Sequence, residues 1–421
     1  MTRLREMRFS YFLRRVIFIG CCTFVFFLPF DFPLSRINLH IPLVKNLTVL
    51  EIAALMLLWE LLVLVERRAP IITGAFAISF FVFFLLHLYS SIFPSERMIW
   101  SLKYTFRFFG VGLVAFLFPN IVEDERQLRF LIRCLFSGGA LAAMCALIQY
   151  RYPYLLTNAQ SFFEDVDIVS PTKIRGFFGW PTDMAVYLGS LIPLALNRMF
   201  YARGKRSYVR ILLLLSFTLL VLLCLLLSRT RGWIVGLFFG LGTLWLIHLL
   251  RGRDYQPIVL AGVCVVILSV VAVSYFPGFI KFGVSDLEPS ELFRLSMVKE
   301  ALKVIREHPL KGIGADMFYW THPNDVRFRT HSLFLEIMVN LGIFGVLTFL
   351  WMLWSIVREI GKGIFAGGDV REISIQIGIL GSLASYLGHM QVDYFWVSYE
   401  CIGLFWILIA IGFCAARLGR K

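Results

Sequence analysis

Charged residues are scarce in this sequence. They make up 16% of its 421 residues, whereas 59% are hydrophobic and the mean hydropathy is +0.77. Apolar runs of about 18 residues or more recur along the chain, each long enough to cross a bilayer as a helix. This composition excludes a soluble globular protein, and the lack of strict polar–apolar alternation argues against an outer-membrane barrel. We expect an all-α polytopic membrane protein, because a helix satisfies its own backbone groups in lipid.

Several motifs of soluble enzymes and metal sites are missing. The sequence has no P-loop, no HExxH motif and no GxSxG motif in a fitting context. Its eight cysteines all lie in apolar runs and form no CxxC pair. We interpret them as small buried hydrophobic residues, not as a disulfide framework or a metal site. Repeats and low-complexity linkers are also lacking, which predicts a single membrane domain over residues 1–421.

The net charge of +14 follows the expected membrane topology. Nearly every loop on one side is basic, which satisfies the positive-inside rule with both termini cytoplasmic. We therefore attribute the charge to topology and expect the lipid bilayer, not nucleic acid, as a partner. About twelve transmembrane helices are predicted, at residues 14–30, 47–65, 71–89, 102–119, 130–150, 183–198, 210–227, 232–250, 257–276, 332–354, 372–389 and 397–416.

One outward loop is long enough to form a cap. Residues 277–331 are expected to lie outside the cytoplasm and to contain an amphipathic helix with a basic face. The helix should lie along the outer membrane surface or cover a cavity, and the segment 308–314, with one proline and two glycines, should end it. Its apolar positions are Leu292, Met297, Val298, Ala301, Leu302 and Ile305.

A group of cations falls on this outer side, where the positive-inside rule does not expect them. Guanidinium groups bind phosphate oxygens bidentately and stay charged, so the group is suited to a diphosphate. Arg175 and Arg231 are the leading candidates. The alternatives are a simple loop cation at Arg175 and contact with lipid headgroups by one of Arg229 and Arg231. The further candidate substrate-binding cations are Lys173, Arg229, Arg294, Arg327 and Arg329.

A polar stripe runs into the helix predicted at 332–354. His331 stands at its start, and Ser332, Glu336 and Asn340 follow at a spacing of four, on one helix face. Polar groups inside a bilayer are costly and usually line a cavity or a functional path. The alternative for His331 is an interfacial residue with a solvated tip.

Two weaker patterns keep other site types open. Glu164, Asp165 and Asp167 could hold a divalent ion for a metal-dependent glycosyltransferase, or they form a solvated loop. Asp393 and Glu400 could belong to a proton path in a transporter, or they are a loop residue and a cavity-facing carboxylate.

The chain resembles the bacterial O-antigen ligase and O-antigen polymerase superfamily of membrane glycosyltransferases. The resemblance rests on five short motifs in the expected order, at Arg175–Pro181, Ser228–Gly232, Glu307–Gly314, His331–Glu336 and Leu341–Gly345. The sequence departs from the family pattern where Thr182 follows the first motif's proline and Ser332 follows the histidine, since asparagine is frequent at both places. These departures leave ligase and polymerase both open.

The resemblance implies a donor glycan linked to undecaprenyl diphosphate, at the outer face of the bacterial inner membrane. Arg175 and Arg231 would hold the diphosphate, and His331 would take the proton of the acceptor hydroxyl as catalytic base. The transfer would be a single displacement with inversion, and the arginines would replace a metal, so no cofactor is implied. Glu336 would orient His331 or line the acceptor cavity.

Three other functions remain open. A polymerase would join lipid-linked repeat units to one another, and a protein-glycosylating relative would use a different acceptor. A transporter of lipid-linked glycans would use the same cations along a path, but such folds often have paired halves with broken helices. The sequence shows no such symmetry.

Overall fold

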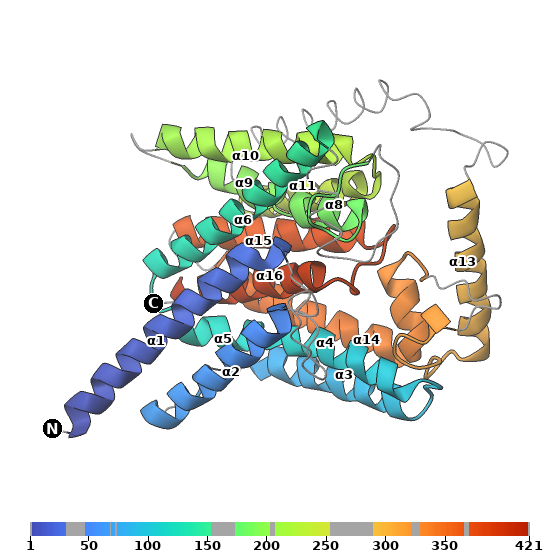
Figure 1. The fold of residues 1–421 in the computed structure, drawn as a ribbon, viewed down its shortest axis with the longest axis horizontal. Coiled ribbons are helices and arrows are strands. Elements are labelled where there is room, and N and C mark those ends of the chain that lie inside the picture. Colours follow the sequence, from blue (N-terminus) through green and yellow to red (C-terminus); the bar gives the residue numbers. More distant parts are fainter. Residues whose placement is uncertain are drawn as a thin grey trace.

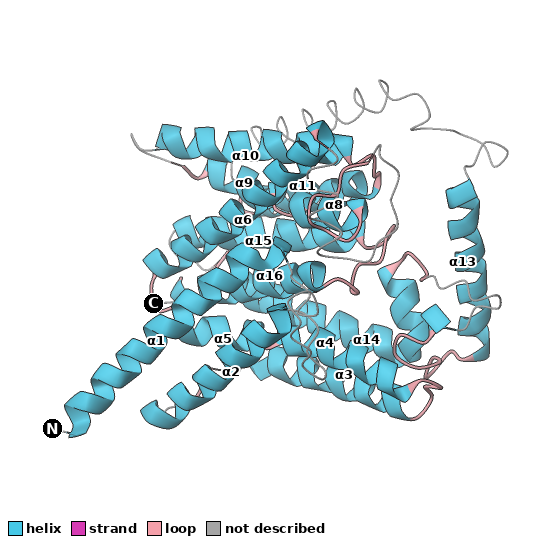
Figure 2. Ribbon diagram, viewed as in Figure 1, coloured by secondary structure: helices cyan, strands magenta, loops and turns pink. Residues whose placement is uncertain are grey.

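The computed structural model describes residues 2–30, 47–67, 69–71, 74–152, 173–202, 207–252, 289–320, 329–365 and 370–419. Every regular element among these residues is a helix (Figure 2), as expected for an all-α protein. In chain order they are α1 (Thr2–Phe27), η1 (Leu28–Phe30), α2 (Leu47–Glu66), α3 (Gly74–Ile92), α4 (Met98–Gly112), α5 (Val114–Ile121), α6 (Glu125–Arg151), α8 (Pro181–Gly189), α9 (Ile192–Phe200), α10 (Ser207–Leu227), α11 (Gly232–Leu250), α13 (Pro289–Glu307), η4 (Phe318–Trp320), α14 (Leu333–Gly361), α15 (Val370–His389) and α16 (Tyr399–Leu418).

Nine helical stretches in the described part of the chain are long and apolar enough to cross a membrane. They coincide with nine of the predicted spans, so the chain is a multi-pass membrane protein. The predicted span at 257–276 lies outside the described residues. The span predicted at 372–389 corresponds to α15, which has sufficient length but carries several buried polar side chains and is not among the nine.

The span predicted at 183–198 is in fact two short helices, α8 and α9. Pro193 lies in the first turn of α9 and has no N–H group, and its ring would clash with the carbonyl group of Gly189 in a continuous helix. The chain therefore breaks between Gly189 and Ile192. The first of the two helices, α8, begins at Pro181, directly after the turn that carries Arg175.

The centre of the bundle is formed by α15 and α16. Almost every residue of α16 is buried, and α15 packs against α9, α11 and α16. The approach of α11 to α15 depends on Gly240, where a Cβ atom would lie 2.9 Å from the carbonyl oxygen of Gly381. These close contacts fix the turn after α15 relative to the start of α11.

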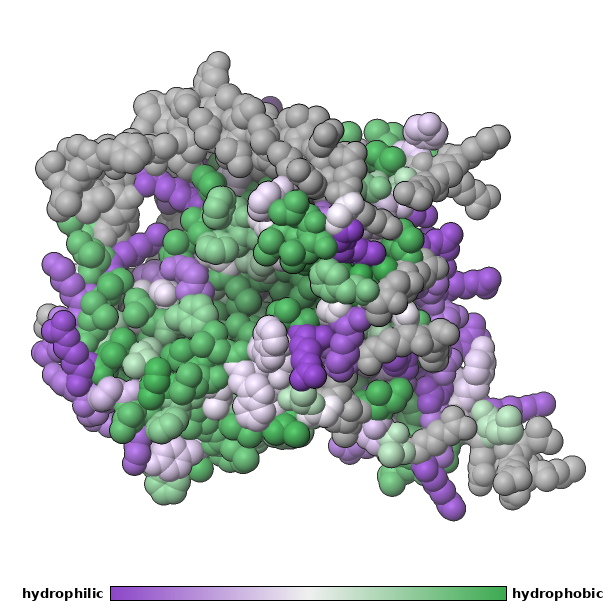
Figure 3. Space-filling view, turned by 180° about the vertical axis from the view of Figure 1, so that it is seen from behind, coloured by the Kyte–Doolittle hydropathy of each residue, from purple (hydrophilic) through white to green (hydrophobic). Residues whose placement is uncertain are grey.

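The outer surface of the bundle is apolar, as expected for a protein in lipid. Leu64, Leu213 and Phe238 are examples of large apolar side chains that are about two-thirds exposed or more, at 73%, 66% and 71%. Figure 3 shows a broad hydrophobic face between two ends that are rich in hydrophilic residues. This arrangement matches a bilayer core with a polar region on each side.

The two ends of the bundle differ in what they carry. The N- and C-terminal ends lie at one end, whereas α13 crosses the opposite end (Figure 1). The described part of residues 277–331 does contain a helix, α13. Met297 and Ala301 are buried on its packed face, but Leu292 and Leu302, which were placed on the same apolar face, are exposed.

Candidate active site

The turn before α14 presents His331. Leu333 begins the helix and donates its backbone N–H to the carbonyl oxygen of Met390 at 2.8 Å, which ties this turn to the end of α15. His331 has a φ of 57°, in the left-handed region that non-glycine residues seldom adopt. Such a backbone is kept only where the surroundings determine it, and it is frequent at functional sites. The side chain of His331 remains 28% exposed.

His331 is held by a buried carboxylate. Its Nδ1 atom lies 3.2 Å from Oδ1 of Asp393, whose side chain is only 8% exposed. Arg294 of α13 donates to the same oxygen from Nη2 at 3.0 Å. An imidazole whose Nδ1 donates to a carboxylate carries its lone pair on Nε2. The ring is therefore oriented for Nε2 to accept a proton.

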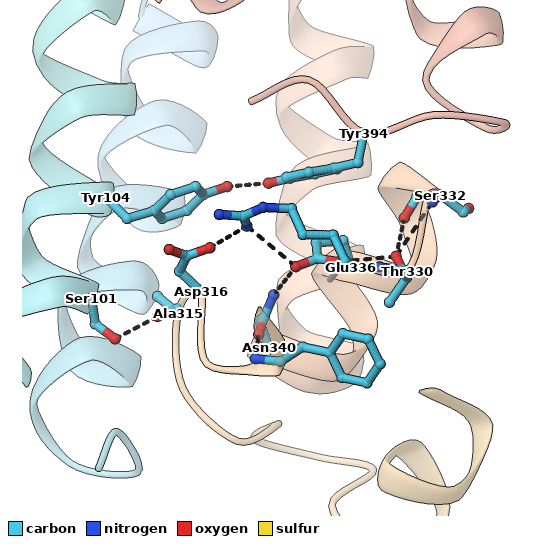
Figure 4. A network of polar contacts seen from close by, with 11 residues as sticks. Ser101, Tyr104, Ala315, Asp316, Thr330, Ser332, Glu336, Asn340 and Tyr394 are labelled. Carbon is cyan, nitrogen blue, oxygen red and sulfur yellow. Dashed lines mark hydrogen bonds and ion pairs between the residues drawn. The ribbon is translucent and has the colours of Figure 1, made fainter. Parts of the chain in front are cut away.

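Arg329, two residues before His331, lies in a compact polar network (Figure 4). Its guanidinium forms an ion pair with Asp316 and lies 3.6 Å from Oε1 of Glu336. Its Cζ atom lies 4.9 Å from the ring centre of Tyr319 and 5.4 Å from that of Tyr394. Burial alone would lower the pKa of Arg329, but the two carboxylates raise the pKa above its usual range. This cation stays charged.

Glu336 fixes the backbone beside His331. Its Oε2 atom accepts hydrogen bonds from the backbone N–H and the hydroxyl of Thr330, both at 2.9 Å. Its Oε1 atom accepts a third from Asn340 Nδ2 at 3.0 Å, so these two members of the predicted polar stripe lie on the same helix face. Ser332, the first position of the predicted stripe, instead faces Gln391 at 3.4 Å. Glu336 holds Thr330, the neighbour of His331 in the chain.

The helix α14 is interrupted, and the segment that follows α13 packs against it at the interruption. Gly342 has a φ of 67° and interrupts the helix. The exposed backbone groups pair with residues 309–314: Ile313 N–H donates to Val339 at 3.0 Å, and Ile343 N–H donates to Pro309 at 2.9 Å. A Cβ atom at Gly342 would lie 2.2 Å from the carbonyl oxygen of Leu310. Gly312 and Gly342, which belong to two separate motifs, therefore lie close together here. Their contacts fix the position of the first half of α14.

Arg175 belongs to a turn directly before α8. Its backbone N–H and that of Gly176 donate to Gln149 Oε1 at 3.0 Å and 2.9 Å. Its Nη1 atom donates to the carbonyl oxygen of Gly179 at 2.8 Å, and the side chain is buried. The guanidinium is thus fixed within the turn, whereas Lys173 at its start is exposed.

Arg229 and Arg231 lie in the turn between α10 and α11. Both side chains are exposed, while the neighbouring Ser228 and Thr230 are buried and contact each other at 2.9 Å. Gly232 packs against the end of α15, where a Cβ atom would lie 2.3 Å from His389 Nε2. Arg231 therefore adjoins the helix end that leads into Asp393.

The structure groups the predicted site residues into several sets. His331 and Arg294 meet at Asp393, and Arg329 meets Glu336. Arg175 and Lys173 occupy a second turn, and Arg229 and Arg231 a third. All three turns lie at the end of the bundle opposite the chain termini (Figure 1). Arg327 and the acidic group at 164–167 lie outside the described residues.

Asp393 and Asp316 are the residues that sequence reasoning did not place in the site. Asp393 lies 62 positions beyond His331, and only the packing of α11, α14 and α15 brings them together. Asp316 has a φ of 63° after the glycine-containing segment 312–314. The position of Asp316 two residues after Gly314 was the available signal. That position does not identify the arginine with which the Asp316 carboxylate pairs.

A comparison with known protein families finds a match within the chain. Residues 211–350 match the family model Wzy_C, described as O-antigen ligase. The matched range includes the turn with Arg231, the helix α13, His331 and the first part of α14, whereas Arg175 and Asp393 lie outside it. No curated protein matches the chain. This match supports a relationship between residues 211–350 of the chain and the O-antigen ligase superfamily.

Proposed function

We propose that the protein transfers a glycan from an undecaprenyl-diphosphate donor to an acceptor hydroxyl, with His331 as the base. The observation that carries this proposal is the contact between His331 Nδ1 and the buried carboxylate of Asp393 at 3.2 Å. A carboxylate in this position selects the tautomer and stabilises the imidazolium that forms during proton transfer. The part of the ring that remains exposed supports contact with a substrate.

The reaction proceeds as a single displacement. His331 Nε2 accepts the proton of the acceptor hydroxyl as its oxygen attacks the anomeric carbon of the donor sugar. The bond from that carbon to the diphosphate oxygen breaks, and the configuration at the carbon inverts. The proton leaves His331 for solvent, since the side chain is partly exposed. General-base assistance of this kind contributes about 10²–10⁴-fold to the rate.

Arg175 and Arg231 hold the departing diphosphate in this proposal. Negative charge grows on the diphosphate as the glycosidic bond breaks, and fixed guanidinium groups stabilise that charge more than the charge of the bound donor. The hydrogen bond from Arg175 to Gly179 supports such a preset orientation. Arg229 and Lys173 are exposed at the same end and add to the positive field. Arg327 completes the set of cations proposed to bind substrate.

Three of the proposed site residues have contacts that favour a positioning role. Arg294 forms an ion pair with Asp393. Its positive charge weakens the attraction of that carboxylate for the proton on His331, so the imidazolium releases the proton more readily. Glu336 and Arg329 are buried in the network below the turn and hold Thr330 in place. We assign these three side chains to the support of His331, with Arg294 exposed enough to contact the donor as well.

The site faces the periplasm in this proposal, because α13 and the three turns lie at the end opposite the chain termini. The membrane is the bacterial inner membrane, where lipid-linked glycans are exposed on the outer leaflet.

The deciding experiment supplies purified full-length protein in proteoliposomes with an undecaprenyl-diphosphate-linked glycan. We expect transfer that requires an added acceptor, which is the behaviour of a ligase. Growth of glycan chains without added acceptor would identify a polymerase of the same superfamily. Absence of transfer with any acceptor, together with movement of the lipid-linked glycan across the bilayer, would contradict the proposal and favour a transporter.

A further inference from the structure

A polar pocket lies at the end of the bundle that carries the chain termini. It has a volume of about 640 Å³ and is formed by the starts of α6, α10 and α15 and the end of α9. Four arginines and two glutamates line it, so its lining has a positive balance. The residues that matter here are Glu125, Arg129, Arg198, Arg210, Arg371 and Glu372.

Two of the four arginines are already engaged. Arg129 forms an ion pair with Glu125 one helical turn away, and Arg371 Nη1 approaches the same carboxylate at 4.0 Å. Arg198 and Arg210 form no hydrogen bond or ion pair with any residue that the structure describes. Arg198 is partly buried, and a buried cation without a partner is costly. An anion in the pocket would offset that cost.

The wall behind Arg198 is held rigidly. Asn197 is fully buried, and its Nδ2 atom donates to the carbonyl oxygen of Ser374 at 2.6 Å. Its Oδ1 atom contacts His248 Nε2 at 2.9 Å. These contacts join α9, α11 and α15 directly beside Arg198, and Ser374 also lines the pocket. A site that is fixed before binding loses less conformational entropy on binding.

We propose that this pocket binds a phosphate group through Arg198 and Arg210. Guanidinium forks match phosphate oxygens and remain charged at any physiological pH. The group belongs either to the headgroup of an anionic phospholipid or to a soluble phosphorylated molecule. The pocket lies at the end opposite His331, so the proposal does not depend on the transfer reaction.

The test uses full-length protein and two variants, Arg198→Gln and Arg210→Gln. In the first arm, inorganic phosphate is titrated by calorimetry into protein in phosphatidylcholine nanodiscs. In the second arm, native mass spectrometry counts the phosphatidylglycerol molecules retained from mixed nanodiscs. Arg8→Gln is the matched control, because it removes an exposed positive charge near the N-terminal end of α1. Arg231→Ala separates this pocket from phosphate bound at the opposite end.

We expect each pocket variant to weaken binding by about tenfold or more in one arm, since each removes a charge-assisted contact. Arg8→Gln and Arg231→Ala should keep that component of binding. Loss in the phosphate arm identifies a soluble ligand, and loss in the lipid arm alone identifies a headgroup. Wild-type binding by both pocket variants in both arms would overturn the proposal. If Arg198→Gln fails to fold, the exposed Arg210 carries the test.

Discussion

At the scale of single residues, the candidate site separates one partly exposed histidine from a buried support. His331 combines a left-handed backbone, a partly exposed ring and a contact with a buried carboxylate. Arg329 and Glu336, close to it in the chain, are buried and hold the backbone instead. The segment 329–336 therefore contains one partly exposed side chain, that of His331, and two buried side chains, those of Arg329 and Glu336, that fix its position.

Removing Arg329 should destabilise the protein strongly. Arg329→Met leaves the carboxylates of Asp316 and Glu336 buried without their cation, and the loss of one partner of a buried ion pair costs about 3–5 kcal/mol. The measurement is the free energy of unfolding in detergent micelles. Lys299→Met, which removes an exposed cation of α13, should change it by about 0.5 kcal/mol or less. Equal effects of the two substitutions would contradict the role given to this network.

At the scale of elements, the central feature is the break in α14. The segment that follows α13 supplies backbone partners for the interrupted helix at Val339, Asn340 and Ile343. The polar side chain of Asn340 also accepts the N–H of Phe318 at 3.0 Å. The break thereby couples α13 to the half-helix that begins beside His331.

Gly342→Ala should displace that half-helix. The added Cβ atom would lie 2.2 Å from Leu310 O, and the left-handed φ alone costs about 1–3 kcal/mol. We expect a lower melting temperature and a loss of glycan transfer, measured on the same preparation. Gly361→Ala at the other end of α14 is the control, because nothing lies within 4 Å of its added Cβ atom. A Gly342→Ala variant as stable and active as the control would show that the break does not position the site.

Much of this arrangement follows from the sequence, and the remainder has identifiable causes. Hydropathy predicts nine of the spans, because burial in lipid depends mainly on apolar length. It predicts one helix at 183–198 where the structure has α8 and α9, since Pro193 divides an apolar run that hydropathy treats as continuous. Hydropathy also misses the break at Gly342, because the apolar run continues across it. Asp393 could not be assigned to His331, because their contact depends on packing between helices that are distant in the chain.

At the scale of the whole molecule, the two polar ends have different contents. One end carries α13 and the turns with Arg175, Arg231 and His331, and the other carries the chain termini and the arginine-lined pocket. The apolar face of the bundle separates these two ends from each other (Figure 3). The proposed function requires the first of these ends to face the periplasm.

Cysteine labelling tests that orientation. A membrane-impermeant maleimide should label Lys299→Cys on α13 in intact spheroplasts, and it should label Arg126→Cys at the start of α6 only in inside-out vesicles. Both positions are exposed, and the unmodified protein gives the background from its own cysteines. The reverse pattern would place His331 on the cytoplasmic side, where the proposed donor glycan is not presented.

The most direct measurement is the initial rate of glycan transfer by His331→Ala and Asp393→Asn, with Lys299→Ala as the matched control. We expect His331→Ala to lower kcat by about 10²-fold or more, because the general base is lost. Asp393→Asn should lower kcat while leaving KM unchanged, since it acts through the orientation and charge of the imidazole. The control should transfer at the wild-type rate. A folded His331→Ala variant with wild-type kcat would contradict the central claim that this histidine deprotonates the acceptor.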